Sequence, residues 1–302
     1  MTLAARKGPK VSVSDHIFDS AVTLFSVLAL VVSIYPLYFV LIASFSNPDL
    51  VSRGEVTLFP KEFTLEAYQY IFKNNQIWRG YANTLLYVTG SVIFGLIITI
   101  PGAYAISRDD MVGHGLFTKL ITFTMFFHGG LIPTYIMMKN FHLVNTPWVV
   151  ILLPCTTVFN VIVARTFFKN NLPRELTEAA EVDGCGNLRF FFSIALPLSS
   201  VVVAIIALYI AVAQWNSFFN AMIYLNEDKY QPLQMVLRKI LITGQTLGNT
   251  GEMTSEEIEA SRRISLLVKY SLIVVSSLPI IMLYPFLQRY FVKGVMIGSI
   301  KG

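Results

Sequence analysis

The sequence predicts an all-α membrane protein with six transmembrane helices. Hydrophobic residues make up 54% of the 302 residues and charged residues only 14%, whereas a soluble domain usually carries about 25% charged residues. The apolar residues are gathered in long runs, each close to the roughly 20 residues with which a helix crosses the hydrocarbon core of a bilayer. Two of these runs contain no charged residue at all. A chain with these three properties is expected to fold within a membrane.

The helices that we expect to span the membrane follow from the boundaries of the apolar runs. In chain order they are residues 17–45, 82–106, 116–138, 147–168, 197–224 and 266–290. The first run follows Arg6, Lys7 and Lys10, as the apolar part of a secretory signal would. Because this run is too long for a cleaved signal, we interpret it as an uncleaved first span.

The tails and the polar connections complete the predicted organisation. We expect an N-terminal tail at 1–16, a first span with its loop at 17–81, a helical core at 82–292 and a C-terminal tail at 293–302. Six spans place both termini on one side of the membrane. The basic residues of both tails favour the cytoplasm for that side, although Lys and Arg summed over all loops divide almost equally. The core then contains a cytoplasmic connection at 170–196 and an external loop at 225–265.

Helix-breaking residues interrupt the third and fourth spans. They are Gly129, Gly130, Pro133, Pro147 and Pro154. Breaks at membrane depth are tolerated where neighbouring helices or a water-filled cavity satisfy the freed backbone groups. We therefore expect a kinked pair of helices with a short external turn at 139–146. The same breaks would also suit helices that bend and part as the protein works.

The connection at 170–196 predicts a helix of its own, although it lies between two membrane spans. Asn171 can cap this helix, and Pro173 suits its first turn. A narrow apolar face with small residues at its centre recurs at helical spacing, at Leu172, Leu176, Ala179 and Ala180. Because this face lies on a connection that is otherwise polar, it predicts that another protein binds here.

A turn and a second helix are expected after residue 183. Gly184 and Gly186 end the first helix, and Asn187 can cap the next one. The spacing Glu-Ala-Ala, three residues, Gly, nine residues, Ile, one residue, Leu-Pro resembles the EAA signature of bacterial ABC-importer permeases. The positions of that signature are filled by Glu178, Ala179, Ala180, Gly184, Ile194, Leu196 and Pro197. An amphipathic surface helix that contains Glu-Ala-Ala by chance is the alternative, and the number of matched positions argues against it.

The resemblance implies the type I ABC importer (MetI-like) permease fold, in which this connection is a cytoplasmic helix–turn–helix that docks onto a separate ATPase. The residues expected to couple the chain to that ATPase are Glu178, Ala179, Ala180, Asp183 and Gly184.

The remaining charges agree with an energy source outside this chain. Those within the spans lie near the span ends, at Asp19, Lys119, Arg165, Lys269 and Arg289. No carboxylate lies deep in a span to bind a coupling proton or sodium ion, which argues against a symporter. The sequence also contains no GxxxxGK[ST] phosphate loop, so it is not itself an ATPase.

No catalytic or metal site is expected. The histidines are scattered, there is no HExxH or GxSxG motif, and Cys155 and Cys185 form no CxxC pair. The basic residues do not alternate with aromatic residues as they would on a nucleic-acid surface, so no nucleic acid is expected among the partners.

Polar, uncharged side chains gather in the outer half of the fifth run, at Tyr209, Gln214, Trp215, Asn216 and Asn220. Aromatic rings beside amides suit sugar rings, whose faces are apolar and whose edges carry hydroxyl groups. An interfacial aromatic belt at the end of a span is the alternative. We expect some of these residues to line a translocation path.

Further motifs are similar to the carbohydrate-type permeases, and within these to the second, smaller membrane subunit of the maltose-transporter type. They are Trp215-Asn216-x-Phe218 and the C-terminal Lys293-Gly294 to Gly302. The run from His128 to Tyr135 and the following Asn145-Thr-Pro-Trp are similar to an oligosaccharide subfamily. The resemblance covers most of the chain.

This resemblance implies a subunit of a sugar importer in the bacterial cytoplasmic membrane, multi-pass and in contact with membrane lipids. Its implied partners are a homologous second permease, a dimeric cytoplasmic ATPase and an extracellular sugar-binding protein. The ATPase would bind ATP and Mg, and this chain would carry no cofactor. The implied contact with the binding protein is at Gly244, Gln245, Thr246 and Gly248. A stand-alone channel or secondary transporter is the alternative function.

Overall fold

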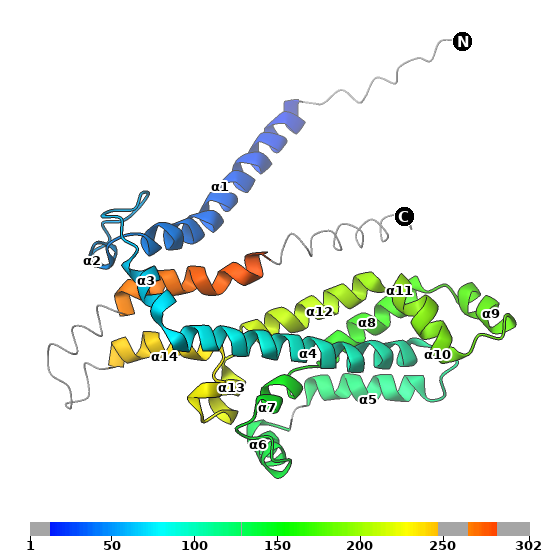
Figure 1. The fold of residues 1–302 in the computed structure, drawn as a ribbon. Helices are drawn as coiled ribbons and strands as arrows, with labels where there is room; N and C mark the ends of the chain where they lie inside the picture. Colours follow the sequence, from blue (N-terminus) through cyan, green and yellow to red (C-terminus); the bar gives the residue numbers. More distant parts are fainter. Residues whose placement is uncertain (1–12, 128, 247–264, 283–302) are drawn as a thin grey trace. The chain divides into compact units, whose positions relative to one another are not determined.

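The structure, a computed structural model, describes residues 13–127, 129–246 and 265–282 (Figure 1). Helices account for most of these residues, and none of them lies in a β-strand, in agreement with the all-α class. The chain divides into two compact units, Met1–Tyr70 with Leu247–Val274 and Ile71–Thr246 with Val275–Gly302. Most of the predicted N-terminal tail and the whole C-terminal tail lie outside the described residues.

The first unit begins with α1, Val13–Ser44, close to the first predicted span at 17–45. Its apolar side chains are exposed along most of the helix, as expected where lipid tails are the neighbours. The end of α1 and the short α2, Pro48–Ser52, enclose a small core that contains Val51 and Val56. The segment that directly follows the first span is therefore packed against the end of α1.

The second unit is built along α4, Asn75–Ser107 (Figure 1). This helix starts earlier than the predicted 82 because Asn74 caps it: the Oδ1 atom of Asn74 accepts a hydrogen bond from the backbone N of Gln76 at 2.9 Å. The connection between the first and second predicted spans, residues 46–81, is partly helical. It contains α2, then α3, Glu66–Lys73, and the first turns of α4.

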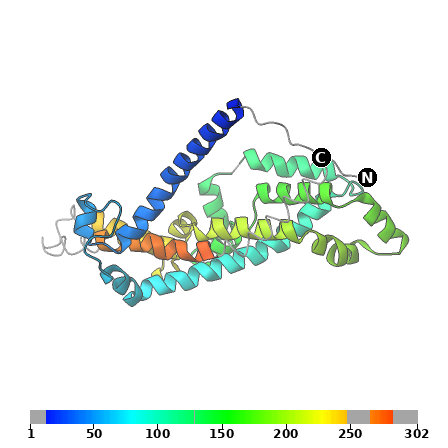
Figure 2. The ribbon, with the colours of Figure 1, turned by 90° about the horizontal axis from the view of Figure 1, so that it is seen from above.

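One side of α4 carries small and hydroxyl-bearing residues. The buried ones are Gly80, Thr84, Ser91, Gly95, Thr99 and Ala103. Their spacing of four or seven residues places them on one face of the helix. The helices that pack most extensively against α4 are α8, Val158–Asn171, α12, Ser200–Trp215, and α14, Leu233–Thr246 (Figure 2). Small side chains permit this packing because they let helix backbones approach closely.

The third predicted span, 116–138, is a bent pair of helices. α5, His114–Phe126, and α6, Leu131–Asn140, meet at 112°. The Gly129-Gly130 pair that predicted a kink lies at this bend, and His128 lies outside the described residues.

The fourth predicted span, 147–168, is wrong as one helix. It consists of α7, Pro147–Leu152, and α8, with residues 153–157 outside any helix. Pro154 has no backbone N–H to continue α7, and Thr157 caps α8 by accepting a hydrogen bond from the backbone N of Asn160 at 3.2 Å.

The fifth predicted span, 197–224, is also not one helix. It consists of the end of α11, Leu196–Leu198, then α12, and then a separate short helix, α13, Phe219–Tyr224. The helical stretch Asn187–Leu198 meets α12 at 77°. Pro197 explains the bend, since it has no N–H for the carbonyl of Ser193. The preceding turn, η1, Phe191–Ala195, is accordingly widened to a π-helix.

Within the described residues, the helices that are long and apolar enough to cross a membrane alone are Ile17–Ser44, Asn75–Ser107 and Ser265–Met282. The two bent pairs raise the number to five if each pair forms one crossing. The last of the single helices starts where the sixth predicted span, 266–290, starts, and residues 283–290 lie outside the described part of the chain.

Candidate functional site

The connection that the sequence predicts to be gripped by a partner contains α9, Arg174–Val182, and α10, Asn187–Phe190. The predicted caps are shifted. Asn171 does not cap α9, because it ends α8, where its Nδ2 atom donates to the carbonyl of Phe167 at 3.0 Å. Pro173 takes the cap position, and its missing N–H costs nothing there. In the same way Gly186 stands at the cap of α10, and Asn187 is its first helical residue.

The turn between α9 and α10 depends on Gly184. Its φ is +72°, a left-handed conformation that glycine adopts without steric cost. The backbone N of Cys185 donates to the carbonyl of Ala180 at 2.8 Å, and that of Gly184 to the carbonyl of Glu181 at 3.0 Å. These two bonds form a Schellman motif, which satisfies carbonyls that the end of α9 leaves free. The geometry makes a compact turn with a defined direction.

Apolar side chains on both sides of this turn are exposed. Val182 is 88% exposed and Leu188 is 76% exposed. Ala179 and Asp183 are exposed as well, whereas Ala180 is buried against Phe168 and the other residues of the main core. Exposed apolar groups around an ordered turn are typical of a surface that binds another protein.

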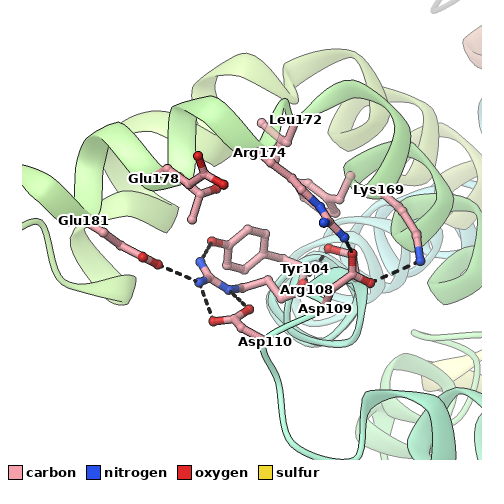
Figure 3. Close-up of a pocket in the computed structure, with 12 residues that line it drawn as sticks. Tyr104, Arg108, Asp109, Asp110, Lys169, Leu172, Arg174, Glu178 and Glu181 are labelled. Carbon is pink, nitrogen blue, oxygen red and sulfur yellow. Dashed lines mark hydrogen bonds and ion pairs between the residues drawn. The ribbon is translucent and has the colours of Figure 1, made fainter.

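A cavity of about 260 Å³ lies between α9, the end of α8 and the loop that follows α4 (Figure 3). Its lining residues are Tyr104, Ser107, Arg108, Asp109, Asp110, Phe168, Lys169, Leu172, Arg174, Thr177, Glu178 and Glu181. Glu178 is exposed at this cavity and makes no hydrogen bond or ion pair with any described residue. Its carboxylate is therefore available to a cationic group from outside the chain.

Ion pairs organise the rest of the cavity. Arg108 binds the carboxylate of Asp110 through two parallel hydrogen bonds, from Nε to Oδ1 at 2.7 Å and from Nη2 to Oδ2 at 2.6 Å. Asp109 pairs with Arg174 and, at 3.3 Å, with Lys169. The hydrogen bond from Arg174 lowers the pKa of Asp109, and the one from Arg108 lowers the pKa of Asp110. Both carboxylates are therefore ionised at neutral pH.

Sequence reasoning missed these residues. The charged cluster Arg108-Asp109-Asp110, which directly follows a long uncharged run, is the sequence feature that could have indicated this network of ion pairs.

The five residues predicted to line a path differ in their exposure. Gln214 is 5% exposed and Trp215 is 4% exposed, and both side chains point into the interior of the second unit. The Nε1 atom of Trp215 donates to the carbonyl of Ser276 at 3.1 Å. Tyr209 and Asn216 are exposed, and Asn220 is half-buried. These residues therefore belong to two environments.

Gln214 completes the break between α7 and α8. Its Nε2 atom donates at 3.2 Å to the carbonyl of Val150, four residues before Pro154, which has no N–H for that carbonyl. The hydroxyl of Ser91 on α4 donates to the next carbonyl, that of Ile151, at 2.9 Å. The hydroxyls of Thr99 and Thr156 lie 2.8 Å apart. Side chains from α4 and α12 thus replace the backbone bonds that the break removes.

The residues predicted to contact a binding protein lie at the end of α14. Gly244, Gln245 and Thr246 are its last residues, and Gly248 lies outside the described residues. The predicted external loop at 225–265 is therefore largely helical in its described part. No group of three or more His, Cys, Asp or Glu side chains that could hold a metal ion occurs in the part of the chain that the structure describes.

Comparisons with known proteins place this architecture in a family. No protein-family model matches the chain. The chain is 37% identical over 289 residues to the protein LplC of Bacillus subtilis (strain 168), covering 96% of each chain. It is 35% identical over 288 residues to the polygalacturonan/rhamnogalacturonan transport system permease protein YtcP of the same organism, covering 95% of this chain and 99% of YtcP.

A solved structure agrees with these relatives. It is described as a bacterial ABC transporter involved in the import of the acidic polysaccharide alginate. One of its chains is 30% identical to this one with a TM-score of 0.83, and the match covers 94% of this chain and 100% of that one. The chain therefore belongs to the sugar permeases of ABC importers and is a multi-pass membrane protein.

Proposed function

We propose that the α9–α10 turn is the docking point for the ATPase that drives this permease. The turn presents Ala179, Asp183 and Gly184 at the surface, with exposed apolar side chains on either side. The carboxylate of Glu178 is free to pair with a cation. Ala180 packs α9 against the main core. The ordered turn with Val182 and Leu188 exposed on either side is the observation that carries the proposal, because exposed apolar groups that lie together mark sites of protein–protein contact.

The topology that we propose has six spans with both termini in the cytoplasm. The α7–α8 pair is then the fourth span, interrupted at 153–157. A broken span requires that the freed backbone groups are satisfied inside the protein. The hydrogen bonds from Ser91 and Gln214 to the end of α7 meet this requirement.

We propose three protein partners on the basis of the relatives: a second permease, a dimeric ATPase that binds ATP and Mg, and an extracellular sugar-binding protein. The end of α14 would face the binding protein. The relative YtcP is a polygalacturonan/rhamnogalacturonan permease, and the solved structure belongs to an importer of alginate. We therefore propose oligosaccharides derived from such polysaccharides as the cargo.

The test of this function is purification through a tag on this chain after coexpression with the candidate second permease and ATPase. We expect both proteins to be recovered with it, and sugar uptake by reconstituted vesicles to require ATP and Mg. Uptake at the same rate by vesicles that contain this chain alone, without ATP, would instead establish a stand-alone channel or secondary transporter.

A second experiment tests the path. We propose that Tyr209 and Asn216 line it, because their side chains are exposed, and that Gln214 and Trp215 support it from within. In a chain without Cys155 and Cys185, Tyr209→Cys and Asn216→Cys are expected to react with a charged thiol reagent in the nucleotide-free or the ATP-bound complex. A wet path exposes a thiolate, whereas lipid does not.

The matched control is Ile210→Cys, since the neighbouring Ile210 is buried in the core. We expect it to stay unreactive in both states. If Tyr209→Cys and Asn216→Cys are as inert as this control, their side chains face lipid and the path is formed by the partner permease.

A further inference from the structure

The loop after α4 contacts α9 at both of its ends. Arg108 and Asp109 are the first two residues after α4, and α9 contains nine residues, from Arg174 to Val182. Asp109 binds the first of them, Arg174, and also Lys169 in the last turn of α8. Arg108 reaches the other end, where its Nη2 atom lies 3.4 Å from the Oε1 atom of Glu181 (Figure 3). Two consecutive residues thus hold two points that lie about 10 Å apart along one helix.

The Arg108 side chain is well suited to this contact because it is itself held in place. It is 14% exposed, and Asp110 and the hydroxyl of Tyr104 accept three of its hydrogen bonds. The Tyr104 ring lies in the main core, 5.5 Å from the ring of Phe168. The guanidinium therefore has a fixed position before it meets Glu181, which reduces the loss of side-chain freedom that usually weakens exposed ion pairs.

Apolar packing alone holds α9 weakly. Ala180 is the only buried residue of this helix, and its side chain is a single methyl group. A single methyl contact does not fix the orientation of α9 on the core, whereas polar contacts at both ends of the helix do. Exposed ion pairs contribute little to stability individually, so these contacts act mainly on the direction and position of α9.

We propose that Arg108 and Asp109 clamp α9 by its two ends to α4, so that α9 and α4 move as one body. This inference rests on the proposed function, in which the ATPase displaces α9. The two residues are positioning residues and contact neither nucleotide nor sugar. A displacement of α9 then reaches α4 directly, without passing through the core.

The N-terminal part of α4, at the opposite end from α9, is bonded to the segment before α14. There the Nδ2 atom of Asn83 donates to the carbonyls of Lys229 and Gln231, at 2.9 and 3.0 Å. The hydroxyl of Thr84 accepts a hydrogen bond from the backbone N of Leu233 at 2.8 Å. Leu233 is the first residue of α14, so α4 is bonded at one end to α9 and at the other to the segment that leads into α14. This continuity provides a physical route between the two segments.

The test is a set of neutralising substitutions in the reconstituted complete transporter. The substitutions at one end of α9 are Arg108→Gln, Glu181→Gln and their combination, and those at the other end are Asp109→Asn, Arg174→Gln and their combination. The control is Glu175→Gln, which removes a charge from the same helix where the described residues provide no partner. Complex recovery, ATP hydrolysis with and without sugar-loaded binding protein, and sugar transported per ATP hydrolysed are measured for each.

We expect normal recovery and basal hydrolysis, with sugar transported per ATP reduced about three- to five-fold at either end and unchanged in the control. Each double variant should be no worse than its single variants, because the members of a pair act as a unit. A general structural defect would instead lower recovery and basal hydrolysis together with transport. If Arg108→Gln is not recovered, the substitutions at Asp109 and Arg174 still decide the question.

Transport per ATP at the wild-type level in all the clamp variants, or a loss no larger than in the control, would overturn the clamp. This failure is distinguishable from failure of the docking proposal by including Gly184→Val in the same set. If Gly184→Val loses stimulated hydrolysis while the clamp variants behave as wild type, α9 docks the ATPase but is not clamped. If Gly184→Val also behaves as wild type, the docking proposal itself is wrong.

Discussion

Replacing Gly184 by valine is expected to abolish the ATP hydrolysis that the sugar-loaded binding protein stimulates, while the chain still enters the membrane in normal amounts. Gly184 has a φ of +72°, where an L-residue pays about 1–2 kcal/mol and a β-branched residue more. The turn would have to change its path, and the hydrogen bond from Cys185 to Ala180 would be lost. Val182 and Leu188 would then no longer flank one compact turn, and the docking surface would be gone.

The matched control is Gly186→Val, two residues further along. Gly186 has φ −67° and ψ 155°, which valine adopts readily, and a Cβ atom there would meet nothing within 4 Å. We expect Gly186→Val to keep most of the stimulated hydrolysis. ATP hydrolysis by the purified complex, with and without loaded binding protein, is the measurement. Equal stimulation in the two variants would show that the shape of the turn does not matter for docking.

Replacing Gly95 by alanine is expected to prevent stable folding of the chain. The added Cβ atom would lie 2.2 Å from the carbonyl oxygen of Cys155 and 2.6 Å from the Cδ1 atom of Ile210. The first of these is a backbone atom in the break between α7 and α8, where Ser91 and Gln214 fix the chain. It cannot rotate away as a side chain would. Overpacking costs about 1–3 kcal/mol in ordinary cores, and we expect the upper end of this range or more.

Gly102→Ala is the control on the same helix, because a Cβ atom at Gly102 has no neighbour within 4 Å. Alanine is about 0.5–1 kcal/mol better than glycine inside a helix, so this variant should be at least as stable as the wild type. Thermal unfolding in detergent and the yield of monodisperse protein distinguish the two. If Gly95→Ala unfolds at the same temperature as Gly102→Ala, then α4 and the break are not in close contact.

Patterns confined to short stretches of sequence predicted the fold class and much of the turn. The apolar runs at 17–45 and 82–106 correspond to α1 and α4. Gly184 marks the end of α9 because a left-handed residue is a local requirement of that turn. The boundary errors are also local in origin: Asn74 caps α4 before its apolar run begins, and Pro173 takes the place predicted for Asn171.

The predicted helices were wrong where an apolar run contains a helix break. Residues 147–168 and 197–224 read as single spans because apolarity does not show whether a proline ends a helix or only bends it. The break at Pro154 depends on Gln214 and Ser91, which lie about sixty residues away on either side. Their side chains stabilise the break by donating hydrogen bonds to the carbonyls at the end of α7. Gln214 was predicted to line a path, and in the structure its Nε2 atom donates to the carbonyl of Val150 at the end of α7.

By itself, then, the sequence determined that this protein is an all-helical membrane protein with a glycine-dependent turn between two short helices, because apolar length, helix capping and left-handed turns are properties of neighbouring residues. Its assignment as a permease came from the resemblance of its motifs to those of a known family. Only the tertiary structure decided which polar side chains are free. Arg108 and Asp109 reach Glu181 and Arg174 across more than sixty residues of sequence, and Glu178 on the same helix has no partner among the described residues. The physical reason is that an ion pair or a buried amide bond is set by distances in space, which the spacing of residues along the chain does not contain.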